Sequence, residues 1–400
     1  MNVNVPRSFC IQLILVLSAI SGFPQQPVTV PSPTPADDSI RIRTEEVRLN
    51  VMAQSSYGRF VASLKPDDLL VVEEGTPQTI TSMRRMSANV LFLLDTGGDL
   101  NLVKNTVLTK LTTKLAIDNL APDDSLAVVE YDDKIQTVSD WTTDRKSVYA
   151  NLDKKLFSGK RARFAQGLNA AVNLFSTRPL ENRHIVIISD GLDSVAGETA
   201  VHQAMQNLLA ANVTVHVISY TKLEEQAAQK SAQRFKMGKG DTKPRVPEEV
   251  FEEMLRGRSY PMDPNRADEV RKYLRAMNSA QRLLIIDLDN ARIRNMRDKQ
   301  RAVSESEPKL QALADDTGGM FQAPEEVATL WTFAADVAKA IDSQYVITYN
   351  PTKAIDSPEQ VRKVRVSSYC DGVTIRSRQK LIVRASEKNT CDGERERSCR

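Results

Sequence analysis

Two aspartates lie where a protein chain can present a carboxylate to a cation or to a partner. Asp95 follows the apolar run of residues 90–94, and Asp190 follows the run of residues 185–189. Such a carboxylate is solvated at the strand end, caps the following helix, or holds a cation. Capping is the simpler role for either aspartate alone. If their strands are neighbours, the two aspartates together indicate a site for a hard cation such as Mg²⁺.

Apolar runs alternate with helical patterns in this part of the chain. The predicted strands cover residues 90–94, 126–131, 184–189 and 213–220, and the predicted helices cover residues 100–119, 164–177 and 198–211. Continuous Val, Ile and Leu strands between helices indicate a parallel sheet that is covered on both faces. Such a sheet binds ligands at the carboxyl ends of its strands. The predicted fold class is therefore α/β, with a doubly wound, mainly parallel sheet.

Shorter strands with alternating polarity precede and follow this sheet. Residues 40–86 form a predicted β-rich module, and residues 344–385 contain further predicted strands before a polar tail of residues 386–400. We expect the two sets of strands to pair with each other into one small β-domain. The sheet domain would then be an insertion within that β-domain.

The charges of the chain give no reason to expect nucleic-acid binding. Lys plus Arg number 54 against 51 Asp plus Glu, a formal charge of +3. Residues 222–301 are more basic, with 19 Lys and Arg against 13 Asp and Glu, and are predicted to be a charged helical insertion. No nucleophile elbow, Walker loop or H-E-x-x-H motif occurs, so we expect neither an enzyme nor an organic cofactor.

The first residues are typical of an export signal. Residues 1–21 combine one arginine, a short apolar core and small residues at a cleavage position, and residues 22–39 form a Pro-rich linker. An uncleaved anchor helix is the alternative, but a core of about 12 residues is short for a membrane span. We expect no transmembrane span after cleavage. The predicted location is therefore outside the cytoplasm: periplasmic, envelope-associated or secreted.

Export would place the remaining cysteines in a compartment that permits disulfides. Three cysteines are left, namely Cys370, Cys391 and Cys399, and three cannot all pair within one chain. A bridge between Cys391 and Cys399, a bridge between Cys370 and Cys391, and free thiols all stay open.

Several stretches, taken in their order along the chain, are similar to a known family. They are VLFLLDTGGDL, DDSLAVVEYDD, HIVIISDGLDS, LQALADDTGGMFQAPEEV and QYVITYNP, together with the preceding β-module. In this order they resemble the von Willebrand factor A-like family, and more closely its bacterial, acidobacterial-type VWFA-related members. The resemblance implies a Rossmann-like sheet domain over residues 87–343, whose upper edge carries a metal-ion-dependent adhesion site.

The metal-site motifs of that family are only partly present. The D-x-S-x-S pattern appears as residues 95–99, DTGGD, so Gly97 and Asp99 replace the two serines. The family's threonine loop falls at residues 161–169, which contain no threonine, and Asp190 matches the last motif. The resemblance therefore implies a degenerate site. Its candidate metal ligands are Asp95, Asp99 and Asp190, and its candidate partner-binding rim consists of Thr96, Gly97, Gly98, Arg163, Gln166, Gly191 and Asp193.

Three carboxylates close together would repel one another and raise at least one pKa. A bound Mg²⁺ or Mn²⁺ would relieve this repulsion, whereas the guanidinium groups of Arg161 and Arg163 would relieve it without any ion. We favour a degenerate edge without a tightly bound cation, and an altered cation site is the alternative.

The predicted function is an exported protein-protein interaction or adhesion module that presents this rim to a protein ligand. The alternative is a structural or assembly subunit of a cell-envelope complex, in which the domain is a metal-free scaffold. A metal-dependent hydrolase that uses Asp95, Asp99 and Asp190 ranks last.

Overall fold

The computed structural model describes residues 46–56, 60–61, 63–98, 105–226, 264–279, 290–353 and 360–383. The predicted signal and linker, the polar tail with Cys391 and Cys399, Asp99 and much of the predicted insertion lie outside these residues. Cys370 is half-buried and forms no disulfide with another described residue. No helix in the described ranges is long and apolar enough to span a membrane.

A six-stranded sheet forms the centre of the larger part of the fold. Its strand order is β10-β9-β8-β5-β6-β7, and every neighbouring pair is parallel except β6 and β7. The predicted fold class, a doubly wound and mainly parallel sheet flanked by β-structure, is confirmed. The strands are β5 (Asn89–Asp95), β6 (Ser125–Tyr131), β7 (Ile135–Thr142), β8 (Arg183–Ser189), β9 (Thr214–Ser219) and β10 (Phe321–Gln322).

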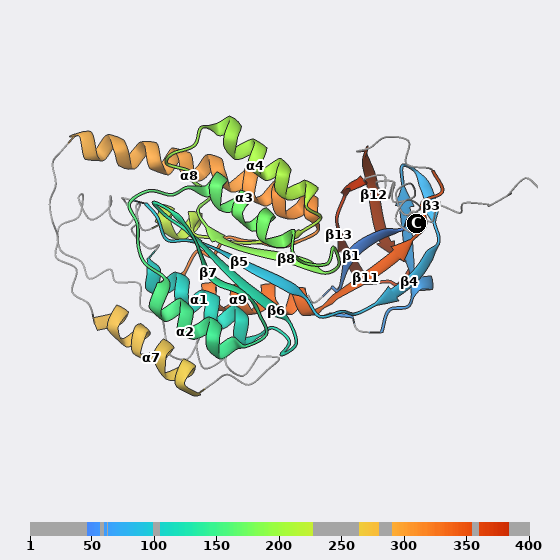
Figure 1. The fold of residues 1–400 in the computed structure, drawn as a ribbon, viewed down its shortest axis with the longest axis horizontal. Coiled ribbons are helices and arrows are strands. Elements are labelled where there is room, and N and C mark those ends of the chain that lie inside the picture. The colour runs from blue at the N-terminus through green and yellow to red at the C-terminus, as the bar shows by residue number, and fades with distance from the viewer. Residues whose placement is uncertain are drawn as a thin grey trace, which may run out of the picture. The chain divides into compact units, whose positions relative to one another are not determined.

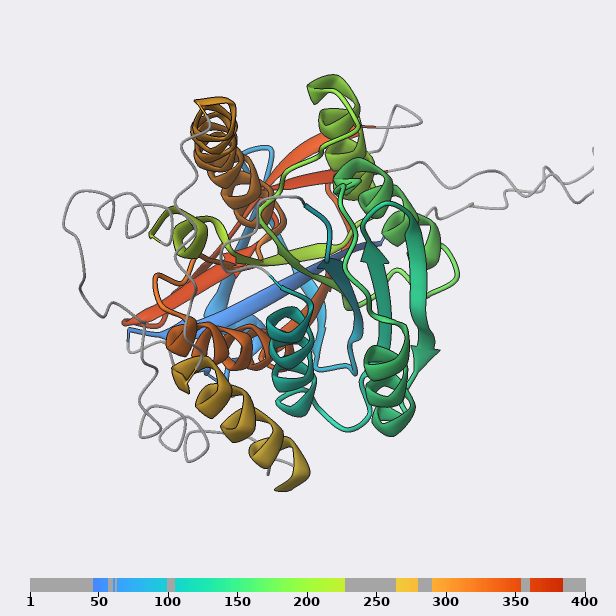
Figure 2. The same ribbon diagram turned by 90° about the vertical axis from the view of Figure 1, so that its left-hand side faces the viewer.

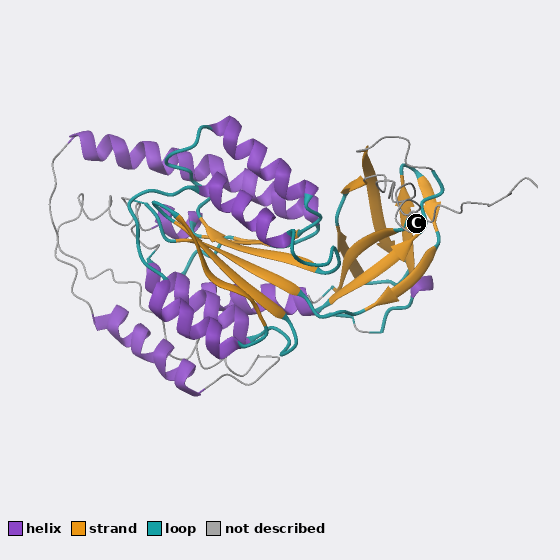
Figure 3. Ribbon diagram, viewed as in Figure 1, coloured by secondary structure: helices purple, strands orange, loops and turns teal. Residues whose placement is uncertain are grey.

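Helices cover both faces of this sheet (Figures 1 and 3). Alternate residues of β5 point to opposite faces: Val90, Phe92 and Leu94 belong to one apolar core, and Leu91 and Leu93 belong to the other. Figure 2 shows the helices in two groups with the strands between them. The first core includes α1 (Thr106–Asp118), α2 (Arg145–Lys155), α7 (Pro264–Ser279) and α9 (Val327–Asp342); the second includes α3 (Phe164–Phe175), α4 (Glu198–Ala210) and α8 (Asn290–Thr317).

The edge strand β7 and the helix α2 are additions that we did not predict from the sequence. β7 is half-exposed over most of its length, so its residues lack the continuous apolar run of the central strands. In α2 only Val148 and Leu152 are buried, which is too few to produce a clear helical period in the sequence. Neither element therefore has a clear pattern in the sequence, and both are identified only from the tertiary structure.

The strands outside this sheet form two antiparallel four-stranded sheets, ordered β13-β1-β11-β4 and β14-β12-β2-β3. Strands from both ends of the chain pair within each sheet, as expected, since β1 pairs with β11 and β13, and β12 pairs with β2. The central sheet is therefore inserted between two halves of one β-domain. The strands are β1 (Val47–Ser55), β2 (Leu69–Glu73), β3 (Thr76–Gln78), β4 (Ile80–Arg84), β11 (Gln344–Tyr349), β12 (Gln360–Ser368), β13 (Val373–Ser377) and β14 (Lys380–Val383), and a 3-10 turn, η1 (Pro66–Asp68), precedes β2.

A buried arginine connects the β-domain to the central sheet. Arg378, between β13 and β14, donates to the carbonyl of Leu209 at 2.8 Å and to that of Val213 at 2.7 Å. The first of these carbonyls belongs to the last turn of α4, where a cation is favoured by the helix dipole. Burial lowers the pKa of Arg378 to about 10, so the side chain stays charged at neutral pH.

Two histidines in adjacent strands, His184 of β8 and His216 of β9, form a buried polar pair. The backbone N–H of Met320 donates to Nδ1 of His216, so the proton of His216 is on Nε2. That Nε2 lies 3.2 Å from Nδ1 of His184, whose own Nε2 lies 2.9 Å from Oδ1 of Asn182. Both rings are therefore neutral Nε2–H tautomers, and a second proton on either ring has no acceptor.

Acidification is expected to destabilise the fold through this pair. Burial lowers the pKa of His184 well below 6.5 and that of His216 to about 3. Below about pH 6.5 the unfolded chain binds protons that the folded chain excludes, so stability is lost as the pH falls from 6.5 towards 3. At pH 5 the two histidines should together reduce the free energy of unfolding by about 4 kcal/mol.

The measurement is chemical denaturation at pH 7.5 and pH 5 of the wild type and of a His184→Gln/His216→Gln double variant. The loss of unfolding free energy between pH 7.5 and pH 5 must be compared between the wild type and the variant. Burial also raises the pKa of Asp124 to about 7, and this shift stabilises the fold as the pH falls. His202→Gln is the control, since His202 is exposed. An equal pH-dependent loss in the double variant and the wild type would contradict the prediction.

Candidate functional site at the carboxyl edge of the central sheet

The carboxyl ends of β5, β6 and β8 meet at one edge of the central sheet, which we call the carboxyl edge. Asp95 of β5 lies opposite Tyr131 of β6, and Leu94 lies opposite Ile188 of β8. Asp95 and Asp190 thus follow adjacent parallel strands. The chain proceeds outward from β5 through β6 in one direction and through β8 in the other, so the strand order reverses here. Sheets of this class bind ligands at such a switch point.

Three side chains from three strands are hydrogen-bonded at this edge. Ser189 Oγ donates to Asp95 Oδ2 at 2.9 Å, and it lies 2.6 Å from the hydroxyl of Tyr131. The single proton of Ser189 points to the carboxylate, so Tyr131 is the donor to Ser189. Burial raises the pKa of Tyr131 well above its usual value, with the charge of Asp95 as the next cause, so the phenol keeps its proton.

The carboxylate of Asp95 is fully buried and faces protein donors on both oxygens. Oδ1 accepts from the backbone N–H of Gly97 at 3.1 Å, and Oδ2 accepts from Ser189. Sequence analysis did not single out Ser189 or Tyr131. The signal was present, since each is a polar group at the end of a predicted apolar strand.

Gly97 lies against the backbone of the loop that precedes α3. A Cβ at this position would lie 2.0 Å from the carbonyl oxygen of Arg161 and 3.0 Å from Cα of Ala162. The serine of the family motif therefore has no room here unless the loop moves. This close approach is the physical reason for a glycine at position 97.

Thr96 is a buried structural residue. Its hydroxyl donates to Oε1 of Glu130 at 2.6 Å, and the same oxygen accepts from the backbone N–H of Phe157 at 3.0 Å. Burial raises the pKa of Glu130, and these two hydrogen bonds partly oppose the shift. Thr96 and Glu130 together hold the loop after α2 against the carboxyl edge.

The residues after β8 also form hydrogen bonds within the protein. Asp190 is buried, and its Oδ1 accepts from the backbone N–H of Leu192 at 3.1 Å. Gly191 adopts a φ of 74°, a conformation that favours glycine. Asp193 Oδ2 accepts from the backbone N–H of Ala165 at 2.9 Å, in the first turn of α3. Asp193 therefore satisfies one of the unpaired backbone N–H groups at the start of that helix.

The two arginines before α3 do not pair with either described aspartate of the edge. Arg161 donates to Asp133 at 2.9 Å, in an exposed ion pair. Arg163 Nη1 donates weakly to Gln166 Oε1 at 3.4 Å, and its Nε is buried without a hydrogen bond. The neutralisation of Asp95 and Asp190 by Arg161 and Arg163 is thus not observed. Gln166 is exposed and Gly98 is half-buried.

The described side chains at the carboxyl edge do not fit a site that binds a divalent cation tightly. Asp95 and Asp190 are buried and accept hydrogen bonds from protein groups, and position 97 has no space for a hydroxyl ligand. Mg²⁺ requires near-octahedral oxygen ligands. No group of three His, Cys, Asp or Glu side chains in the described ranges is arranged to hold a metal ion. Asp99, the third candidate ligand, lies outside those ranges.

Exposed apolar side chains lie in the segments after β5 and β8 and in the loop between α2 and α3. Phe157 is 61% exposed and Val195 is 46% exposed, in the loops before α3 and α4, and Val107 is 51% exposed in the first turn of α1. Phe157 is joined to the edge through its backbone bond to Glu130. These residues were not predicted from the sequence, because an isolated apolar residue in a loop has no periodic pattern.

The family comparison agrees with this architecture. Residues 90–192, which include β5 through β8 and the loop to Leu192, match the family model of the von Willebrand factor type A domain. These residues are therefore similar to the von Willebrand factor type A domain, as the resemblance to that family implied. The acidobacterial-type affiliation stays a prediction. No curated protein matches the chain.

Among the solved structures that are similar to this chain is a von Willebrand factor type A protein from Catenulispora acidiphila. It has 13% sequence identity and a TM-score of 0.39, and the match covers 86% of this chain and 75% of that one. An aerotolerance-related membrane protein from Bacteroides fragilis has 14% identity, a TM-score of 0.32 and coverage of 63% and 98%. The type V pili tip protein Mfa5 from Porphyromonas gingivalis has 19% identity, a TM-score of 0.23 and coverage of 29% and 44%. The similarity to the von Willebrand factor type A domain rests on the family match over residues 90–192.

Proposed function

We propose that the protein is a non-catalytic protein-interaction module that binds a folded protein partner at the carboxyl edge without a tightly bound cation. The observation that carries this proposal is the set of exposed apolar residues there. Of the six exposed large apolar residues among those described, Val107 and Val195 lie in the segments after β5 and β8, and Phe157 lies in the loop after α2 that is hydrogen-bonded to Glu130 of β6. Exposed apolar side chains rimmed by polar groups are typical of interaction surfaces.

The buried hydrogen bonds of the edge support this role. Asp95, Ser189 and Tyr131 join three strands, and Glu130 holds the loop of Phe157. A surface whose loops are held in place loses little conformational entropy when a partner binds. Asp95 is fully buried and accepts hydrogen bonds from protein groups on both carboxylate oxygens, so we propose that adhesion through a bridging cation is not the mechanism. Cleavage of the signal and an envelope or extracellular location are part of the proposal.

The proposal predicts that a Phe157→Arg/Val195→Arg variant loses its partner. Immobilised protein is incubated with an envelope fraction of the source bacterium, and retained proteins are quantified by mass spectrometry. We expect the retention of at least one protein to fall tenfold or more in this variant, because two anchors of the surface are replaced by charges. The retention should be the same with Mg²⁺ and with a chelator.

A Leu180→Arg/Val361→Arg variant is the matched control, since it adds the same charges at two exposed apolar positions away from the carboxyl edge. It should retain the partner as the wild type does. Equal losses of the partner in both variants, or no loss in either, would overturn the proposal. If the partner is retained equally by the wild type and by both variants, the protein is better described as a structural or assembly subunit. Retention that a chelator abolishes would restore the cation mechanism.

A further inference from the structure

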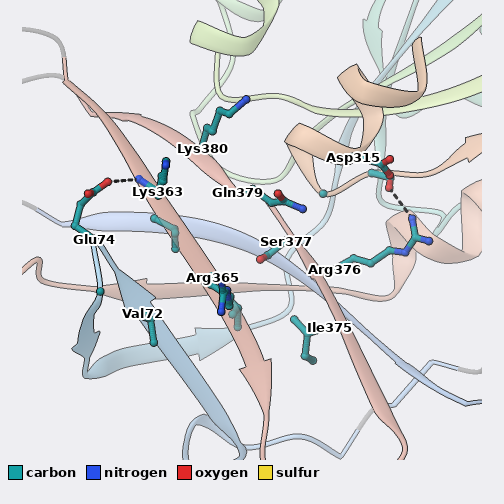
Figure 4. A pocket seen from close by; sticks show the side chains of 15 residues that line it. Val72, Glu74, Asp315, Lys363, Arg365, Ile375, Arg376, Ser377, Gln379 and Lys380 are labelled. Carbon is teal, nitrogen blue, oxygen red and sulfur yellow. Dashed lines mark hydrogen bonds between the residues drawn. The ribbon is translucent and has the colours of Figure 1, made fainter. Parts of the chain in front are cut away.

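A groove of about 910 Å³ lies in the β-domain, beside the turn that follows α8 (Figure 4). Its walls come from β2, β12, β13 and β14 and from Gly318 and Gly319. None of these elements belongs to the carboxyl edge. Its charged lining residues are Lys363, Arg365, Arg376 and Lys380 against Glu74 and Asp315.

Two of the four cations of the groove lie on one strand. Lys363 and Arg365 are exposed and alternate along β12 with the buried residues Val364 and Val366, so they lie on one face of the sheet. Neither side chain forms an ion pair with a described residue, in contrast to Lys380, which lies 3.0 Å from Asp316. Figure 4 shows Lys363 and Arg365 between Glu74 on one side and Asp315 on the other.

The acidic residues of the groove do little to neutralise these cations. Glu74 Oε1 accepts from the backbone N–H of Lys363 at 2.5 Å, which engages the carboxylate with the main chain instead of the ammonium group. Arg376 donates to the carbonyl of Gly319 at 3.2 Å, a neutral partner. The groove therefore retains an excess of positive charge that is accessible to a ligand.

The spacing of the cations indicates the form of that ligand. Side chains two residues apart on a strand are separated by roughly 7 Å, and an extended peptide repeats at the same distance. The apolar residue Val72, directly opposite Arg365, and Ile375 supply contacts between the charges. A compact anion would touch one cation at a time, whereas an extended peptide with carboxylates at alternate positions would face Lys363 and Arg365 together.

We propose that this groove binds an extended acidic segment of a partner protein, with carboxylates at alternate residues. The strand β13 lies at the end of its four-stranded sheet, and its residues Ile375, Arg376 and Ser377 line the groove. An extended ligand beside such an edge is a common mode of peptide recognition. Charge complementarity selects acidic segments, and the strand spacing selects an extended conformation.

The test uses a fluorescent ten-residue peptide in which glutamate alternates with threonine, and fluorescence anisotropy with the full chain. We expect the peptide to bind, and a peptide with glutamine in place of glutamate not to bind. A Lys363→Glu/Arg365→Glu variant should weaken binding by about tenfold or more, because both charges that face the ligand are reversed. The affinity of the wild type should fall as the salt concentration rises.

A Lys146→Glu/Lys154→Glu variant is the control, because it makes the same change in net charge at two exposed lysines of α2. It should change the affinity less than twofold. Equal weakening in the two variants would show non-specific attraction and overturn the proposal, as would displacement of the peptide by tripolyphosphate at lower concentration than by unlabelled peptide. Phe157→Arg/Val195→Arg should bind the acidic peptide normally, so failure here and failure at the carboxyl edge are distinguishable.

Discussion

Gly97→Ser is expected to destabilise the protein by about 3 kcal/mol and to create no cation site. The substitution restores the first serine of the family motif, so a motif-based argument predicts improved metal binding. The structure predicts the opposite, because the new Cβ would lie 2.0 Å from the carbonyl oxygen of Arg161. Either the loop before α3 or the end of β5 must move, and both are held by hydrogen bonds, that of the β5 end being buried.

The measurements are the free energy of unfolding by chemical denaturation and calorimetric titration with Mg²⁺ and Mn²⁺. Gly197→Ser is the matched control, because a Cβ there meets nothing within 4 Å. Gly197 is also the N-cap of α4 and has no side-chain cap, so a serine should be neutral or stabilising by a few tenths of a kcal/mol. A stable Gly97→Ser protein that binds Mg²⁺ would refute this account of the site.

Arg362→Met is expected to cost about 3–5 kcal/mol of stability, because it leaves a carboxylate buried in the β-domain without its cation. Arg362 Nη1 lies 2.5 Å from Glu73 Oε1, and the two side chains are only 2% and 3% exposed. Arg362 also donates to the carbonyl of Lys353 at 3.0 Å. Methionine fills much of the same volume, so the loss reports the missing charge more than a cavity.

The control is Lys380→Met, which removes an exposed ion pair with Asp316 and should cost under about 1 kcal/mol. A Glu73→Leu/Arg362→Met double variant should regain most of the loss, because no buried charge is left unpaired. Chemical denaturation of the three variants measures both effects. Equal stability of Arg362→Met and Lys380→Met, or a double variant as unstable as Arg362→Met, would contradict the argument.

The apolar strands of the central sheet could be predicted from the sequence, because residues buried on both faces form continuous Val, Ile and Leu runs. Residues 126–131 were predicted and the strand is Ser125–Tyr131; residues 213–220 were predicted and the strand is Thr214–Ser219. Asp95 and Asp190 could be placed at one edge for the same reason, since parallel strands end together. The strands near the two chain ends could be predicted from their alternating polarity, whereas which of them pair depends on contacts far apart in the sequence.

The parts of the site that depend on long-range contacts could not be predicted. The loop of Arg161 lies on Gly97, more than sixty residues away along the chain, and its side chain pairs with Asp133 instead of a strand-end aspartate. A pattern of neighbouring residues gives no information about a contact across that separation in the sequence. The exposed Phe157 and the half-exposed strand β7 were missed because neither has the periodic burial that a sequence shows.

The sequence by itself determined the class of sheet, the edge at which a ligand would bind and the loss of the family's serines, because these follow from local polarity and from motif letters. Only the tertiary structure decided what those residues do. In the folded chain the carboxylate of Asp95 accepts hydrogen bonds from Ser189 and Gly97, and Asp193 accepts one from the first turn of α3. Lys363 and Arg365 both line an open groove. The physical reason is that the role of a charged side chain depends on the partners that folding brings within hydrogen-bond distance, and those partners lie far away in the sequence.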